Sequence, residues 1–271
     1  MSWFRLPEEE KWQDFELALN LATSHPRLFE AVHAYEFDDF QRAIQHVSSP
    51  GKTGVVPLKN WAQEGSRMEI GTIGAGAFAQ AFAKRALKAG HMVKLSNSRG
   101  PENLRQVVNQ LGPGAMAATK EEAAACEMVL LAVPWDNVPQ TLASLPKWKN
   151  QILIDGTNPF HGQAGNFTPA NVGNLSTSQF VAALAPGARV VKALNNMIVP
   201  SLEADPVLNG ARRVAFISAD DAGAKKRVET LLRTFGYAVV DLGNLRDGGL
   251  IQQAGGPLAG RDFFERGEYS E

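Results

Sequence analysis

Hydrophobic and polar positions change their spacing along this chain near residue 68. After that point, short apolar runs typical of buried strands alternate with stretches in which apolar residues recur at helical spacing. The strand-like runs cover 69–73, 91–96, 128–133, 151–154, 189–194, 213–218 and 237–242. Helix-like stretches lie over 77–89, 101–111 and 221–234, and another helix begins after the capping box at Thr119. This alternation predicts an α/β fold with a doubly wound, mostly parallel sheet.

The first 67 residues do not share this alternation. They hold nine of the chain's 22 aromatic residues, so their composition is not that of a disordered tail. Pro7 followed by three glutamates is typical of a helix start, and a second helix is expected to end at His46. We therefore predict two parts, an N-terminal helical appendage with its linker over 1–67 and a second domain over 68–271.

Composition narrows the class of protein further. With 271 residues, 44% of them hydrophobic, the chain can bury a full core. Its net charge of −1, without a sustained basic block, gives no reason to expect nucleic acid or an anionic membrane as a partner. No apolar run is long enough to span a bilayer and no signal peptide is recognisable, so a cytoplasmic location is expected. The single cysteine, Cys126, excludes an intrachain disulfide, and the five histidines have no metal-ligand spacing, so no metal is expected.

The most informative motif follows the first strand-like run, where Gly74, Gly76 and Ala79 form the pattern G-x-G-x-x-A. A strand, a tight glycine turn and an immediate helix are the order that a dinucleotide pyrophosphate site requires. Gly74 would make the turn. Gly76 would let the pyrophosphate approach bare backbone at a helix start, where unpaired N–H groups attract an anion. The motif in this context predicts a Rossmann domain that binds a dinucleotide.

The end of the second strand indicates which dinucleotide fits. Enzymes that use NAD usually carry an acid there, which accepts hydrogen bonds from the ribose 2′-hydroxyl. This chain instead continues as Ser96, Asn97, Ser98 and Arg99, without a carboxylate in reach. Arg99 can pair with a 2′-phosphate, and Asn97 and Ser98 add neutral donors. We therefore predict NADP as the cofactor.

Three later strand ends should lie around the nicotinamide. A connection of about twenty residues, 156–176, leaves the carboxyl end of a strand, where open α/β sheets bind ligands. The residues assigned to the cofactor are Ala132, Val133, Pro134 and Asn158; those assigned to the substrate are Trp135, Pro159, Asn195, Asn196 and Met197. Strand-end packing is an equal alternative for 133–135. No catalytic side chain is assigned, because hydride transfer requires two rings held face to face more than a protein acid.

Several of these pieces occur together in one known family. They are Ile73-Gly74-Ala75-Gly76, Gly90-His91, Ser96-Asn97-Ser98-Arg99-Gly100-Pro101-Glu102, Ala132-Val133-Pro134-Trp135, Asp155-Gly156-Thr157-Asn158-Pro159, Val190-Val191-Lys192-Ala193-Leu194-Asn195 and Gly255-Gly256-Pro257-Leu258. In this order, residues 68–260 resemble the NADPH-dependent coenzyme F420 reductases, also called F420-dependent NADP oxidoreductases. The resemblance implies a compact Rossmann enzyme that passes hydride between NADP and a 5-deazaflavin bound in the same crevice. It also implies that Ala75, Gly76, Ala77 and Phe78 hold the pyrophosphate.

Two departures from the family leave the acceptor open. Archaeal members carry a histidine at the position of Asn195 or Asn196, and they continue into a further C-terminal helix. A flavin, a quinone or a small carbonyl compound therefore remains an alternative to coenzyme F420, and a non-catalytic NADP-binding sensor is the alternative from another class. The expected partners are a small redox acceptor and a second copy of the chain in a homodimer.

The N-terminal part resembles a different family. The segment from Tyr35 to Ile44, followed by Pro50-Gly51-Lys52-Thr53-Gly54-Val55-Val56, resembles the C-terminal tail of medium-chain quinone oxidoreductases. This resemblance implies that residues 1–58 are a fragment without chemistry of its own. The alternative is a helical appendage that covers an apolar face or a subunit interface.

Overall fold

The computed structural model describes residues 35–36, 58–59, 67–163, 166–173 and 175–266 of the 271-residue chain. The chain divides into two units, 1–66 and 67–271. In the first unit, β1 (Tyr35–Glu36) and β2 (Leu58–Lys59) pair in parallel. The helices predicted within residues 1–67, and all but these strands of the segment that resembles quinone oxidoreductases, lie outside the described residues.

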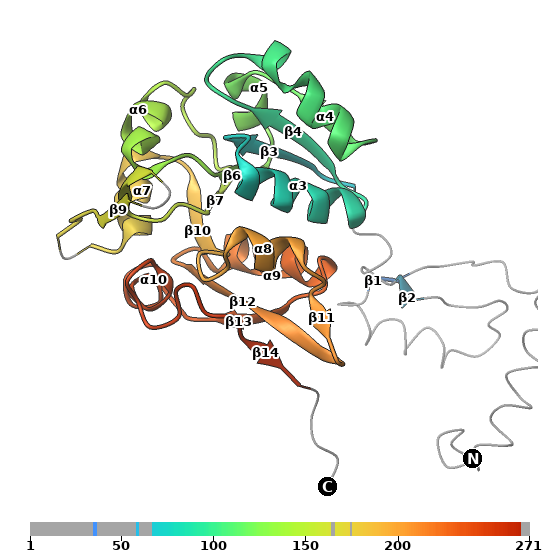
Figure 1. The fold of residues 1–271 in the computed structure, drawn as a ribbon, viewed down its shortest axis with the longest axis vertical. Coiled ribbons are helices and arrows are strands. Elements are labelled where there is room, and N and C mark those ends of the chain that lie inside the picture. The colour runs from blue at the N-terminus through green and yellow to red at the C-terminus, as the bar shows by residue number, and fades with distance from the viewer. Residues whose placement is uncertain (1–34, 37–57, 60–66, 164–165, 174, 267–271) are drawn as a thin grey trace, which may run out of the picture. The chain divides into compact units, whose positions relative to one another are not determined.

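The second unit is built on one twisted sheet (Figure 1). Its strands run in the order β11-β12-β10-β7-β6-β3-β4-β5, and β13 and β14 also pair with β12. Their bounds are β3 (Glu69–Ile73), β4 (Met92–Ser96), β5 (Ala115–Ala117), β6 (Met128–Leu131), β7 (Ile152–Asp155), β10 (Arg189–Ala193), β11 (Val207–Leu208), β12 (Ala211–Ala219), β13 (Ala238–Asp241) and β14 (Phe264–Glu265). Neighbouring strands from β5 to β10 are parallel, whereas β12 is antiparallel to β10. The predicted doubly wound, mostly parallel sheet is confirmed.

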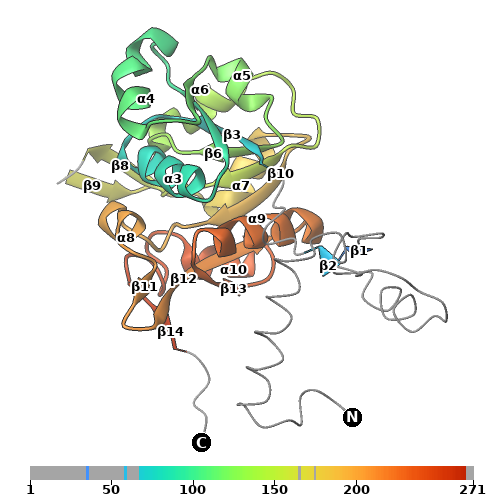
Figure 2. The same ribbon diagram turned by 90° about the vertical axis from the view of Figure 1, so that its right-hand side faces the viewer.

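Helices cover both faces of this sheet (Figure 2). Their bounds are α3 (Ala77–Lys88), α4 (Arg105–Leu111), α5 (Lys120–Ala124), α6 (Val138–Ala143), α7 (Thr177–Leu184), α8 (Val199–Glu203), α9 (Ala222–Thr234) and α10 (Asp247–Gln252), with short 3-10 turns η4 (Pro101–Leu104) and η5 (Trp135–Asn137). The chain therefore alternates strand and helix through most of the unit, as its hydrophobic pattern predicts.

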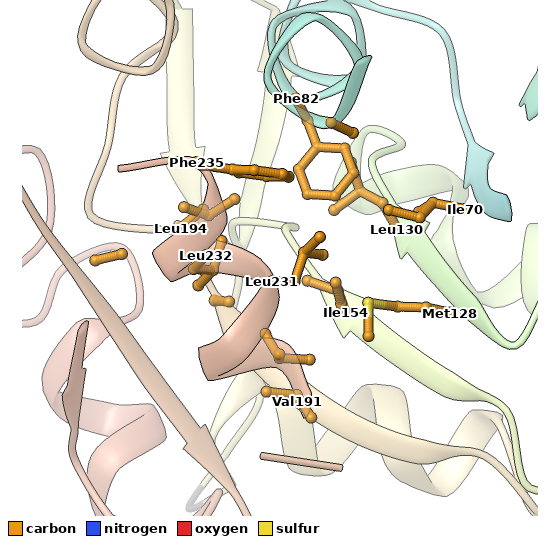
Figure 3. Packing of buried hydrophobic residues seen from close by; sticks show 14 of the residues in the cluster. Ile70, Phe82, Met128, Leu130, Ile154, Val191, Leu194, Leu231, Leu232 and Phe235 are labelled. Atoms are coloured by element: carbon orange, nitrogen blue, oxygen red, sulfur yellow. The ribbon is translucent and has the colours of Figure 1, made fainter. Parts of the chain in front are cut away.

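Successive side chains of each strand point to opposite faces of the sheet, so every strand contributes to the core on each face. In β6, Met128 and Leu130 face the core that includes α3 and α9, while Val129 and Leu131 face the core beneath α5, α6 and α7. All four side chains are buried, as expected for a strand covered on both faces. Figure 3 shows the first of these cores, where Phe82 of α3 meets Phe235 edge to face at a centroid distance of 5.5 Å. This contact joins residues from the two ends of the unit.

Some elements differ from the sequence-based expectation. The predicted helix 101–111 is a 3-10 turn followed by α4, and Leu104 is buried there while Val107 and Val108 are only half-buried. The long connection 156–176 forms a hairpin of β8 (Phe160–Gln163) and β9 (Asn166–Pro169), at the left of Figure 1. Hydrophobic periodicity did not reveal these short elements, because too few residues repeat for a pattern to stand out.

Candidate dinucleotide site

The order of the sheet creates a binding position beside β3. Because β3 pairs with β4 on one side and with β6 on the other, the connections leave the sheet in opposite directions at its carboxyl edge. Such a switch point is where open α/β sheets bind ligands. A cavity of about 740 Å³ lies there. Its lining includes Gly74, Ala75, Gly76, Ser96, Asn97, Ser98, Arg99, Ala132, Val133 and Pro134. The fold thus brings three segments predicted to bind the cofactor into one cavity wall.

The turn after β3 requires glycine at its first position. Gly74 has a φ of +109°, and a Cβ there would lie 2.2 Å from the carbonyl oxygen of Ala132 at the end of β6. The turn is held from both sides, since the Gly74 N–H donates to the Ser96 carbonyl at 3.1 Å and the Thr72 hydroxyl donates to the Gly74 carbonyl at 2.9 Å. Gly74 therefore shapes the loop and has structural reasons to be glycine.

Gly76 is glycine for a different reason. It is the N-cap of α3, with a φ of −71°, and a Cβ there would meet no atom within 4 Å. No side chain caps α3 and no acid lies in its first turn. Side chains of Thr119, Ser176 and Asp221 cap α5, α7 and α9, while the shorter helices α4, α6, α8 and α10 also lack a side-chain cap. The first N–H groups of α3 have no intrahelical partner, and they carry the positive end of the helix dipole. The start of α3, which includes Ala77 and Phe78, therefore fits a bound pyrophosphate.

The loop after β4 presents Ser98 and Arg99 at the surface. Ser96 itself is fully buried, and its hydroxyl donates to the Thr72 carbonyl at 2.7 Å, so its side chain belongs to the sheet. Asn97 Oδ1 accepts from the Arg99 N–H at 2.9 Å and fixes the turn. The exposed Arg99 makes no ion pair with any described residue. Its guanidinium is therefore available to an anionic ligand.

The cavity wall also contains residues that were not assigned from the sequence, namely Gln80, Asn103, Lys120, Gln140, Thr141 and Ser144. Gln80 Nε2 donates to the Ala75 carbonyl at 2.8 Å and so braces the glycine loop. Gln80 stands in the first turn of the helix that follows the glycine motif, a position that could have marked it. The others lie in η4, in α5, in α6 or directly after α6, and only the packing of these elements brings them to the cavity.

Of the residues predicted to lie around the nicotinamide and the substrate, Ala132, Val133 and Pro134 line this cavity, and the others do not. Trp135 is buried, and its ring meets that of Phe180 at 5.4 Å between centroids. Asn158 follows β7, and its Oδ1 is buried without a hydrogen-bond partner among the described residues. A buried acceptor of this kind could receive a donor such as the carboxamide of nicotinamide. Asn158 therefore fits the role predicted for it, while Pro159 beside it is buried.

The segment after β10 points into the protein. Leu194 adopts a left-handed backbone conformation with a φ of +65°, which is uncommon for a residue other than glycine. Asn195 Nδ2 then donates to the Thr157 carbonyl at 2.6 Å, and Asn196 Nδ2 to the Val214 carbonyl at 3.3 Å. Both asparagines and Met197 are buried. Their contact with a substrate stays a prediction, and in this structure the asparagines connect neighbouring strands and loops.

A buried ion pair supports the loop that carries Asn158. Lys192 Nζ lies 3.6 Å from Asp155 Oδ2, and both side chains are fully buried. Burial lowers the pKa of Lys192, while the neighbouring Asp155 carboxylate opposes that shift. The same carboxylate accepts from the Thr157 N–H at 2.9 Å and from the Ser178 hydroxyl. These bonds fix the backbone where the chain leaves β7.

Other reactive groups lie at the surface or in the core. His161 Nδ1 pairs with Asp136 between β8 and η5, and this hydrogen bond lowers the pKa of Asp136. Cys126 is buried, and burial raises the pKa of its thiol. Among the residues that the structure describes, no group of three His, Cys, Asp or Glu side chains could hold a metal ion. Nor is any helix in the described ranges long and apolar enough to cross a bilayer.

A sheet order that reverses beside a glycine turn and an uncapped helix start is typical of NAD(P)-binding oxidoreductase domains, and this unit is one of them. Residues 69–159 match the sequence model of the family described as NADP oxidoreductase, coenzyme F420-dependent. The match covers about a third of the chain, and over residues 69–159 it agrees with the family that the motifs indicate.

Two solved structures are similar to this chain. A hypothetical protein from Sinorhizobium meliloti is 33% identical, with a TM-score of 0.69 over 76% of this chain and 100% of its own. A protein from Arthrobacter sp. FB24, described as an F420-dependent NADP reductase, is 26% identical with a TM-score of 0.56, over 67% of this chain and 89% of its own.

A curated relative comes from another group of reductases. Metalloreductase STEAP3 of Rattus norvegicus is 28% identical over 178 residues, which are 65% of this chain and 34% of the relative. The chain thus spans about a third of the length of the curated relatives it matches.

Proposed function

We propose that this chain binds NADP(H) in the cavity beside β3 and transfers hydride between it and a deazaflavin-like acceptor such as coenzyme F420. The observation that carries the proposal is the start of α3, where Gly76 lines the cavity and no side chain caps the first backbone N–H groups. An anion at that position would replace the side-chain caps that α5, α7 and α9 possess.

The remaining parts of the cofactor follow from this position. Backbone groups of Gly74, Ala75 and Gly76 would hold the pyrophosphate, and Ser98 and Arg99 would hold the 2′-phosphate. Ala77 and Phe78 do not line the cavity, so a contact from their backbone stays a prediction. The adenosine would lie over Leu104 and Val107, two of the apolar residues in the cavity wall. The dinucleotide is long enough that its nicotinamide would then lie toward the ends of β6 and β7, near Pro134 and Asn158.

The chemistry proposed for this site depends on how the two reacting rings are positioned. The bound nicotinamide supplies the hydride, and the chain's own residues hold the two rings close and exclude competing water. Asn158 would orient the carboxamide through its unpaired Oδ1. The Asp155–Lys192 pair would keep Asn158 in place, because it anchors the loop in which Asn158 lies. No side chain need exchange a proton with the nicotinamide during hydride transfer.

A second candidate acceptor is a flavin that passes electrons to a metal ion. The similarity to metalloreductases favours it. A metal ion accepts one electron at a time while hydride carries two, so a flavin would have to stand between NADPH and the metal. A quinone or small carbonyl acceptor has no comparable support.

The test uses the purified full-length chain. We would measure equilibrium binding of NADPH and NADH, and then NADPH oxidation with coenzyme F420, with riboflavin and with a ferric chelate in the presence and absence of riboflavin. The proposal expects NADPH binding and turnover with coenzyme F420. Turnover with riboflavin alone would replace the deazaflavin by a flavin. NADPH binding without turnover on any acceptor would indicate a sensor, and absence of NADPH binding would contradict the proposal altogether.

A further inference from the structure

Lys120 is a cation in the cavity wall whose surroundings suggest a ligand. It is the first residue of α5, directly after the Thr119 cap. Its Nζ donates to the Ser144 hydroxyl at 2.9 Å, and that hydroxyl in turn donates to the Thr141 carbonyl at 2.8 Å. Lys120, Ser144 and Thr141 all line the cavity. The ammonium is therefore held in the wall by a neutral partner rather than by a carboxylate.

The register of the sheet brings Lys120 to the same edge as Arg99. Strands β4 and β5 are parallel neighbours, with Leu95 opposite Ala117 and the Ala118 N–H donating to the Leu95 carbonyl at 2.9 Å. Arg99 follows the end of β4 and Lys120 follows the end of β5. Because the carboxyl ends of parallel strands meet at one edge of a sheet, the two cations enter the same cavity from adjacent segments.

The charge of the cavity wall is one-sided. Among the described residues that line it, the charged ones are Arg99 and Lys120, and none is an aspartate or glutamate. Some lysines of the unit are paired, such as Lys84 with Glu203 at 3.0 Å and Lys94 with Glu69 at 2.7 Å. Others, such as Lys147, are unpaired among the described residues but do not line the cavity. Neither Arg99 nor Lys120 forms an ion pair within the described part of the chain. Two unpaired cations in one wall suit a ligand group that carries two negative charges, as a phosphate monoester does.

We propose that Lys120 is a second determinant of the preference for NADP over NAD. Its ammonium binds the 2′-phosphate together with Arg99, and Ser144 holds the ammonium in position. This assignment rests on the proposed function, since it requires the adenosine half of NADP in the cavity. It adds a residue that lies 21 positions beyond Arg99 in the sequence.

The experiment compares ligands that differ only in the 2′-phosphate. Binding of 2′,5′-ADP, 5′-ADP, NADPH and NADH is measured by calorimetry for the full-length wild type, Lys120→Met, Lys120→Arg, Ser144→Ala and the control Lys147→Met. Lys147 is exposed and does not line the cavity. Lys120→Met should weaken 2′,5′-ADP and NADPH about tenfold to a hundredfold, the range for a hydrogen bond to a charged group. The 5′-ADP and NADH affinities should change less than twofold.

The other variants keep the test decisive. Lys120→Arg should retain most of the affinity for 2′,5′-ADP, and Ser144→Ala should lose a smaller share that is confined to the two 2′-phosphate ligands. Lys147→Met should behave as wild type. Equal losses for ligands with and without the 2′-phosphate would overturn the assignment in favour of an adenine or pyrophosphate contact, and unchanged binding would reduce Lys120 to a wall residue. If the wild type binds none of the four ligands, the proposed function itself fails. If Lys120→Met does not fold, Ser144→Ala and Lys120→Arg decide.

Discussion

At Gly76 the fold tolerates a side chain, whereas the bound cofactor would not. Because its φ is −71° and an added Cβ would meet no atom within 4 Å, Gly76→Ala should fold as well as wild type or slightly better. The new methyl group would stand where the pyrophosphate approaches α3, so NADPH should bind about tenfold more weakly, or about 1.4 kcal/mol. Thermal unfolding and NADPH titration of the same preparation measure the two effects.

Gly74 provides the control for this substitution. Gly74→Ala must place a Cβ 2.2 Å from the Ala132 carbonyl oxygen at a φ of +109°, so it should lose about 1 to 3 kcal/mol of stability. A stable Gly74→Ala together with an unstable Gly76→Ala would reverse the roles given to the two glycines.

Arg99 carries the expected cofactor preference. Arg99→Ala should weaken NADPH binding by about 1.5 to 3 kcal/mol, the range for a hydrogen bond to a charged group, while NADH binding stays nearly unchanged. Titration with both nucleotides measures the difference. A loss of the same size for NADH would show that Arg99 does not bind the 2′-phosphate.

Strand β3 and helix α5 pack so closely that their contact has no room for a side chain. A Cβ on Gly71 would lie 1.9 Å from the Ala123 carbonyl oxygen, a backbone atom that cannot move aside without shifting α5. Gly71→Ala should therefore lower the free energy of unfolding by about 1 to 3 kcal/mol or more. Urea denaturation measures it, and a cost below 0.5 kcal/mol, roughly the spread of neutral surface substitutions, would show that α5 moves easily.

The Asp155–Lys192 pair joins β7 to β10 inside the sheet. Asp155→Ala would leave the Lys192 ammonium buried without its counter-charge, at a cost of about 3 to 5 kcal/mol. Asp155→Asn combined with Lys192→Met removes both charges and should recover part of that loss. Denaturant unfolding of both variants and of wild type measures this coupling. A double variant no more stable than Asp155→Ala would contradict the idea that the unpaired, buried Lys192 ammonium causes the loss.

The whole unit should become more stable when the cofactor is present. A ligand that binds only the folded state stabilises it by an amount set by its concentration relative to Kd, about 2.7 kcal/mol at a hundredfold excess. The cavity is formed by segments from β3 to α6, so unfolding must release the ligand. Saturating NADPH should therefore raise the unfolding temperature, and NADH at the same concentration should raise it less. Equal shifts would contradict the predicted preference for NADP.

The local features of this protein follow from its sequence. Short, continuous apolar runs between helix-like stretches predict the parallel strands, because a strand covered on both faces must be apolar along its length. The Thr119 capping box is present as predicted, since its residues contact each other within one turn. Gly74 and Gly76 can be recognised in the sequence because their roles are also local. Gly74 has a positive φ in the turn, and Gly76 begins a helix that no side chain caps.

Only the tertiary structure decided which distant residues share the cavity. Lys120 donates a hydrogen bond to Ser144, a residue 24 positions further along the chain. Lys120 reaches this position because β5, the strand before it, pairs with β4, and local sequence does not specify that pairing. The same holds for Asn195 and Asn196, whose side chains bond to Thr157 and Val214. The sequence determined the strands, the turn and the family. The pairing of strands far apart in the chain decided the wall of the site, because contacts across a sheet depend on packing that local patterns do not contain.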